Sequence, residues 1–180
     1  MRHALLALYQ AADHAVAGFA DATGLRCPDG CGACCANSTP MVSSLEAAAI
    51  ADELARRGRA EAVLAEARVA GDRRCALYDG DDRHGRCTVY ALRPVMCRLY
   101  GFAAVQRDGQ PDLSVCRVHA MAIPEAVGAA VALVDGGGAV PEFADWAAQS
   151  VALTPAAAGT APAPARRMND ALIEVLEGAR

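Results

Sequence analysis

The chain has 180 residues and is 54% apolar, but alanine and the 8 cysteines supply more than half of that fraction. The formal net charge is only −4, which argues against a nucleic-acid-binding protein, since these normally have a basic surface. The longest apolar run, residues 127–134, is far shorter than the roughly 20 residues of a membrane span. Polar residues also interrupt the apolar N-terminus before it reaches signal-peptide length. We therefore expect a cytoplasmic protein with no nucleic-acid or membrane partner.

The first half of the chain predicts helices, because alanine-rich segments carry larger apolar residues at helical spacing. The first helix should cover residues 3–22. Ser43 and Glu46 match a capping box that opens a second helix, which should end at Gly58. A third should cover residues 61–69.

The second half predicts further helices whose boundaries are set by proline and glycine. Pro94 should begin a short helix that carries Cys97. Another should begin near Ser114, break at Pro124 and continue to the glycines at 136–138. A short helix should also follow Pro141.

Strand signals are few. Residues 75–78 and 86–90 flank a turn rich in glycine and aspartate, so we expect one short β-hairpin in a mostly α-helical domain. Residues 1–150 should form this domain, and residues 151–165 should form a Pro/Ala linker. Residues 166–180 should form an amphipathic helix that docks on the domain or binds a protein partner.

The cysteines all lie in the central part of the chain, and half of them fall within nine residues. They are Cys27, Cys31, Cys34, Cys35, Cys75, Cys87, Cys97 and Cys116. Disulfides would need an oxidising compartment, and buried structural thiols explain isolated cysteines better than a dense run. A metal site explains the density and the glycines between the cysteines, and thiolates favour zinc, copper(I) and iron–sulfur clusters. Because large apolar side chains are scarce, we expect this site to nucleate the fold.

The number of metal ions stays open at this point. Adjacent Cys34 and Cys35 should point in different directions, so a site in which both bind the same metal ion would be strained. Eight thiols suffice for two four-cysteine sites, but one site with additional structural cysteines is equally compatible. The spacing of Cys27, Cys31 and Cys34 also matches the radical-SAM signature. The chain lacks the alternating strands and helices of those enzymes, which argues against that assignment.

Two segments, CPDGCGACC and CALYDGDDRHGRCTVYALRPVMCR, resemble the bacterial CxxCxxCC (YkgJ-type) cysteine-cluster family. These are zinc- or iron-chelating domains and include a flagellin lysine N-methylase branch. The first cysteine gap holds three residues here, whereas the family name has two. The resemblance covers about residues 27–102 and implies metal chelation, with Cys116 as a later member of the set. The matching positions are Cys27, Cys31, Cys34, Cys35, Cys75, Cys87, Tyr90, Arg93, Pro94, Cys97 and Arg98.

Two arginines and one histidine are further candidates. A four-thiolate zinc site or an oxidised [4Fe–4S] cluster carries a net charge of about −2, which is costly to bury unpaired. Arg93 and Arg98 lie close to Cys97 in sequence and should neutralise it, unless they are ordinary surface residues. His119 follows Cys116 by three residues. It is either a further metal ligand beside Cys116 or a partly buried histidine with no role in binding.

The function expected from these residues is chelation of Zn²⁺ or a [4Fe–4S] cluster through the eight cysteines. One alternative is an iron–sulfur-dependent redox enzyme or methyltransferase that resembles flagellin lysine N-methylases. Another is a protein-interaction module with structural zinc, in which the last helix contacts the partner. The sequence leaves the metal, the substrate and the oligomeric state open.

Overall fold

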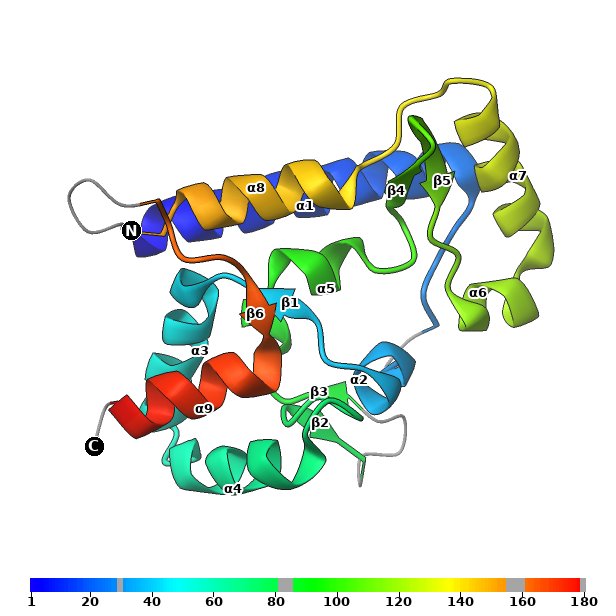
Figure 1. Cartoon of the computed structure of the whole chain (residues 1–180). Coiled ribbons are helices and arrows are strands. Elements are labelled where there is room, and N and C mark those ends of the chain that lie inside the picture. The colour runs from blue at the N-terminus through cyan, green and yellow to red at the C-terminus, as the bar shows by residue number, and fades with distance from the viewer. Residues whose placement is uncertain (29–30, 81–85, 155–160, 179–180) are drawn as a thin grey trace.

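The computed structural model describes residues 1–28, 31–80, 86–154 and 161–178 (Figure 1). It confirms a mostly α-helical protein in which short strands form antiparallel pairs. Two parts of the predicted organisation, the 81–85 turn with His84 and residues 155–160 of the linker, lie outside the described residues.

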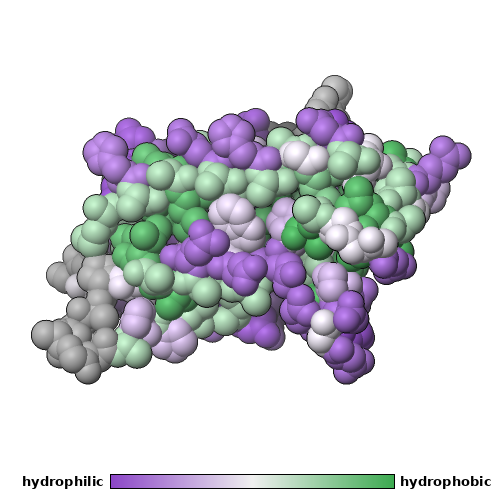
Figure 2. Space-filling view, turned by 90° about the horizontal axis from the view of Figure 1, so that it is seen from above, coloured by the Kyte–Doolittle hydropathy of each residue, from purple (hydrophilic) through white to green (hydrophobic). Residues whose placement is uncertain are grey.

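The upper layer in Figure 1 consists of α1 (Arg2–Thr23) and α8 (Phe143–Ala152), which run side by side above α5 (Val95–Leu99). Apolar residues recur along one face of α1 and pack on the start of α5, as the helical spacing predicts. The cluster includes Leu5, Leu8, Tyr9, Ala12 and Val95. Seen from above, this layer carries intermixed hydrophobic and hydrophilic residues (Figure 2).

The lower layer contains α3 (Ser44–Arg56), α4 (Ala60–Ala70) and the last helix, α9 (Met168–Gly178). The apolar face of α9 packs on α3 and α4 and joins the largest buried cluster through Leu172 and Leu176. Directly before it, β6 (Arg166–Arg167) pairs with β1 (Met41–Val42). The last helix is therefore docked on the rest of the chain.

At the right of Figure 1, α7 (Pro124–Asp135) packs beside the end of α1 and the hairpin of β4 (Ala104–Arg107) and β5 (Gln110–Leu113), and α6 (Arg117–Ala122) packs on α7. The two helices meet at the break predicted at Pro124. Phe19, Phe102 and Ala130 belong to the small cluster buried here.

The sequence predicted only one strand pair, β2 (Tyr78–Asp79) with β3 (Arg86–Cys87), and these strands are shorter than expected. Residues that follow β3 form the 3₁₀ turn η1 (Tyr90–Leu92) instead of more strand. The β4–β5 hairpin was not predicted, although its Asp108-Gly109 turn, with φ values of 53° and 78°, is a strong hairpin signal. Within the described residues, no helix combines the length and apolar character needed to cross a bilayer.

A buried carboxylate joins α3 to α5. The predicted capping box is present: Glu46 Oε2 accepts a hydrogen bond from the Ser43 amide at 2.9 Å, and the Ser43 hydroxyl accepts one from the Glu46 amide. The other carboxylate oxygen accepts the Val95 amide at 2.8 Å. Glu46 therefore caps the first turns of both α3 and α5, and so helps to place Cys97.

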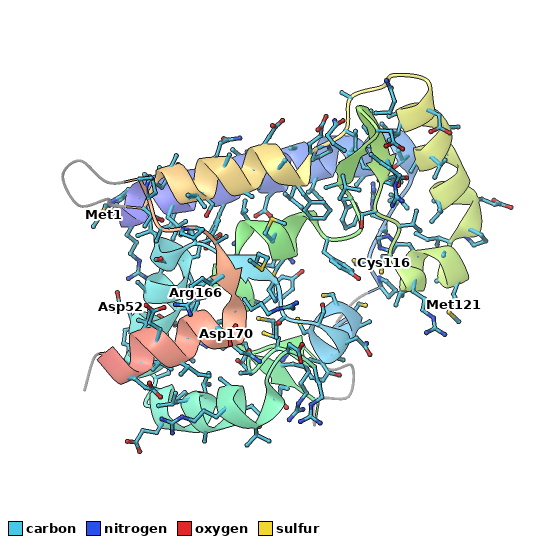
Figure 3. The ribbon with its side chains drawn as sticks, viewed as in Figure 1. Met1, Asp52, Cys116, Met121, Arg166 and Asp170 are labelled. Carbon is cyan, nitrogen blue, oxygen red and sulfur yellow. The ribbon has the colours of Figure 1, made fainter. Side chains whose placement is uncertain are left out.

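We predict that Glu46→Gln lowers the free energy of unfolding by about 1–3 kcal/mol, because the amide group presents a donor to one of two buried N–H groups. Chemical denaturation of the full chain measures this loss. Asp52→Asn on the exposed face of α3 (labelled in Figure 3) is the matched control and should change stability by less than about 0.5 kcal/mol. Equal effects of the two variants would contradict a capping role for Glu46.

Candidate metal centre

The cysteine-rich segment forms a short helix, α2 (Ala33–Asn37), that begins after Gly32. The sulfur atoms of Cys34 and Cys35 lie 3.9 Å apart. The prediction that these side chains point in different directions was therefore wrong. Neighbouring residues on a helix are rotated by about 100°, which still allows both side chains to turn into the same space.

Three further thiols reach Cys34 from other parts of the chain. Cys75 donates its amide to the Cys35 carbonyl at 2.9 Å, Cys87 ends β3, and Cys97 lies on α5. Burial raises the pKa of all three thiols, and the charge on Cys34 raises each further. We call Cys34, Cys35, Cys75, Cys87 and Cys97 the Cys34 group.

Backbone amides support two of these sulfurs. The Leu77 amide forms a hydrogen bond to the Cys75 thiol, and the Val89 amide forms one to Cys87. Both donors lie two residues beyond the cysteine, and each bond favours the thiolate and lowers its pKa. Amide donors of this kind orient thiolate ligands and stabilise their charge in metal sites. Burial still dominates, and the pKa of Cys75 rises to about 12.

Cys34 is the exception within this group, because its pKa is lowered. A hydrogen bond from the Cys35 thiol lowers the pKa of Cys34 to about 6, and the positive charge of Arg93 lowers it too. The same arginine also favours the thiolate forms of Cys27 and Cys87. Its guanidinium lies 4.2 Å above the Tyr90 ring, which holds the charge near the thiols.

The other predicted arginine, Arg98, is buried and has a network of structural contacts. It forms an ion pair with Asp13 on α1, donates to the carbonyls of Ala91 and Arg93, and lies 4.2 Å above the Tyr9 ring. These contacts fasten the Cys97 helix to α1. A role for Arg98 as a counter-charge to the metal centre stays a prediction.

A second gathering of donors lies at the start of α6, where Figure 3 labels Cys116. Cys27 Sγ is 3.4 Å from His119 Nε2. Burial raises the pKa of Cys27 to about 11, with further contributions from the charges of Cys31 and Cys116. Burial lowers the pKa of His119, which favours its neutral, metal-binding form. We call Cys27, Cys31, Cys116 and His119 the Cys27 group.

Asn169 on α9 holds the backbone on either side of Cys75, a member of the Cys34 group. The sequence did not predict this role. Its buried side chain accepts the Ala76 amide at 2.9 Å and donates to the carbonyls of Gly71 and Arg74. The residues flanking Cys75 are therefore anchored to the last helix. A buried asparagine that satisfies three backbone groups has no local sequence pattern, because its partners are more than ninety residues away.

Among the described residues, the possible ligands have the spacing of a metal site only in pairs. All eight cysteines are free thiols. In the described part of the chain, no three His, Cys, Asp or Glu side chains already converge as a metal-binding group. Two donor pairs do have the spacing of zinc ligands. Tetrahedral zinc has bonds of about 2.3 Å to sulfur and about 2.0 Å to nitrogen. These bonds place two sulfur ligands about 3.8 Å apart, and a sulfur and a nitrogen ligand about 3.5 Å apart. The Cys34–Cys35 and Cys27–His119 pairs fit these values.

A pocket of about 320 Å³ adjoins the Cys34 group. Cys34, Cys35 and Cys97 lie on its wall, and apolar side chains such as Met41 and Phe143 line most of the remainder. Three thiols of the group are thus reachable from outside the core.

The histidines His3 and His14 lie on the exposed face of α1.

Comparison with known proteins agrees with this arrangement. A family model described as "CxxCxxCC: Putative zinc- or iron-chelating domain" matches residues 26–120, a range that includes every cysteine and His119. Comparisons with the curated proteins and with solved structures gave no match. The matched range is more than half of the chain, and the chain belongs to the CxxCxxCC family of zinc- or iron-chelating domains.

Proposed function

We propose that this protein binds a zinc or iron centre through the Cys34 group. The observation that carries the proposal is that thiols from four separate segments lie near Cys34, with the Cys34 and Cys35 sulfurs 3.9 Å apart. Five thiols exceed the four that one tetrahedral zinc or one [4Fe–4S] cluster needs. We infer that the eight cysteines serve as metal ligands, and that Arg93 supplies charge compensation beside them.

The chemistry of these residues supports metal binding over inert packing. Neighbouring thiols interact only weakly with one another while they remain protonated, whereas each thiolate would form a strong bond to a bound metal ion. The amides of Leu77 and Val89 already donate to Cys75 and Cys87, as amides that stabilise thiolate ligands do. When bound, the metal would supply cross-links between α2, α5 and the β2–β3 segment.

The pocket favours a second candidate function, an iron–sulfur-dependent redox enzyme or methyltransferase. Cys34, Cys35 and Cys97 on its wall would leave a bound centre beside a space large enough for an apolar substrate group. A purely structural zinc, in contrast, is normally enclosed by its ligands. Anaerobic purification, elemental analysis and a visible spectrum test this candidate: it requires brown protein with acid-labile sulfide, and colourless protein with zinc would contradict it.

We predict that Cys97→Ser lowers the metal content of the anaerobically purified chain by about one ion or cluster, because serine is a poor ligand for these metals. Metal analysis per chain measures the change. Met96→Leu is the control, since Met96 precedes Cys97 on α5 and lines the same pocket. Full metal content in Cys97→Ser would contradict the assignment of the Cys34 group.

Chelation should also release protons. Without metal, burial keeps the pKa values of Cys75, Cys87 and Cys97 above their ordinary range, so these thiols hold protons at pH 7. Metal binding requires thiolates, so we predict release of at least about two protons per zinc ion. Affinity should then rise roughly a hundredfold from pH 6.5 to 7.5.

Zinc titration in weakly buffered solution counts the released protons, and competition with a chelator of known pH dependence gives the affinity. A zinc affinity that does not change over this pH range would contradict binding by the buried thiols.

A further inference from the structure

The geometry points to a second zinc site, formed by Cys27, Cys31, Cys116 and His119 and separate from the Cys34 group. This inference rests on the proposed function, because it assumes that the chain is a metal-binding protein. It adds a histidine ligand and assigns the cysteines to two centres. Three sulfurs and one imidazole form a ligand set typical of closed, structural zinc sites.

The strongest observation is the contact between Cys27 and His119, which are far apart in the sequence. Cys27 Sγ lies 3.4 Å from His119 Nε2, close to the separation of about 3.5 Å between sulfur and nitrogen ligands on a tetrahedral zinc ion. Cys116 precedes His119 by three residues at the start of α6, and Cys31 follows Cys27 by four residues in the same segment. The contact therefore brings two pairs of possible ligands together.

The histidine ring is held in a fixed orientation. The His119 side chain is 1% exposed, and its ring meets the Phe102 ring edge-on, with the ring centroids 5.1 Å apart and the planes at 70°. Since Phe102 packs on one side, the Nε2 edge is directed to Cys27. Cys116 and His119 are three residues apart at the start of α6, so they lie on the same side of that helix.

Gly101 allows this arrangement. Its φ is +85°, and an added Cβ would lie 3.0 Å from Cys116 Cβ and 3.1 Å from His119 Cε1. Only glycine combines that backbone conformation with so close an approach. The loop that leaves the Cys97 helix is thus packed directly on the Cys27 group, and the two proposed centres are neighbours with separate ligands.

Donor numbers support two centres. The Cys34 group alone has enough thiols for four-coordinate metal, and the Cys27 group has four donors of its own. Adding His119 to the eight thiols gives sufficient ligands for two tetrahedral ions without sharing.

The test is zinc reconstitution of the full chain under reducing conditions, with metal analysis and circular dichroism. We expect two zinc ions per wild-type chain and one in His119→Ala. His14→Gln, which replaces an exposed histidine on α1, should retain two zinc ions. His119→Cys should also retain two, and after cobalt(II) substitution its spectrum should shift toward an all-sulfur site, a change that a merely packed histidine would not produce.

The outcomes separate this inference from the proposed function. Two zinc ions in His119→Ala would overturn the second site, as would one ion per wild-type chain that is lost in Cys97→Ser and kept in His119→Ala. If Cys97→Ser and His119→Ala each lost all metal with helicity unchanged, the chain would have a single shared centre, and the second site would be overturned. Absence of metal from the wild-type chain would defeat the proposed function itself.

Discussion

The grouping of thiols from four segments around Cys34 is the constraint on which the rest of the structure depends. Cys35, Cys75 and Cys87 pack against the largest apolar cluster, and Cys97 follows Val95 of the cluster under α1. Phe102 of the remaining cluster contacts His119. These clusters are small because alanine supplies much of the apolar composition. Metal–sulfur bonds at their junction would join them, so that the free energy of metal binding contributes directly to folding.

Three buried polar side chains bring the cysteine-bearing segments to this junction. Glu46 ties the start of α5 to α3, Arg98 ties α5 to Asp13 of α1, and Asn169 ties the residues around Cys75 to α9. Each of them satisfies backbone or charged groups that would otherwise be buried without partners. The ligands are therefore held by the fold from several directions, which restricts how far they can move when a metal binds.

The sequence predicted what depends on neighbouring residues. The capping box at Ser43 and Glu46 and the helix break at Pro124 follow local rules, and both are present. The pairing of Cys27 with His119 and the contacts of Asn169 join residues more than ninety positions apart, and no periodicity or spacing reports such contacts. The separation of Cys34 and Cys35 was mispredicted because side-chain rotamers, and not helix periodicity alone, decide where two adjacent sulfurs lie.

The most direct measurement is thermal unfolding of the full chain, followed by circular dichroism, before and after complete metal removal under reducing conditions. Coupling of metal binding to folding predicts loss of helical signal or a melting temperature lower by roughly 10 °C or more, since several kcal/mol of stability would be lost. Restoring zinc or iron should restore the transition. An unchanged melting curve after complete metal removal would show that the buried thiols hold the fold without metal and would contradict the account.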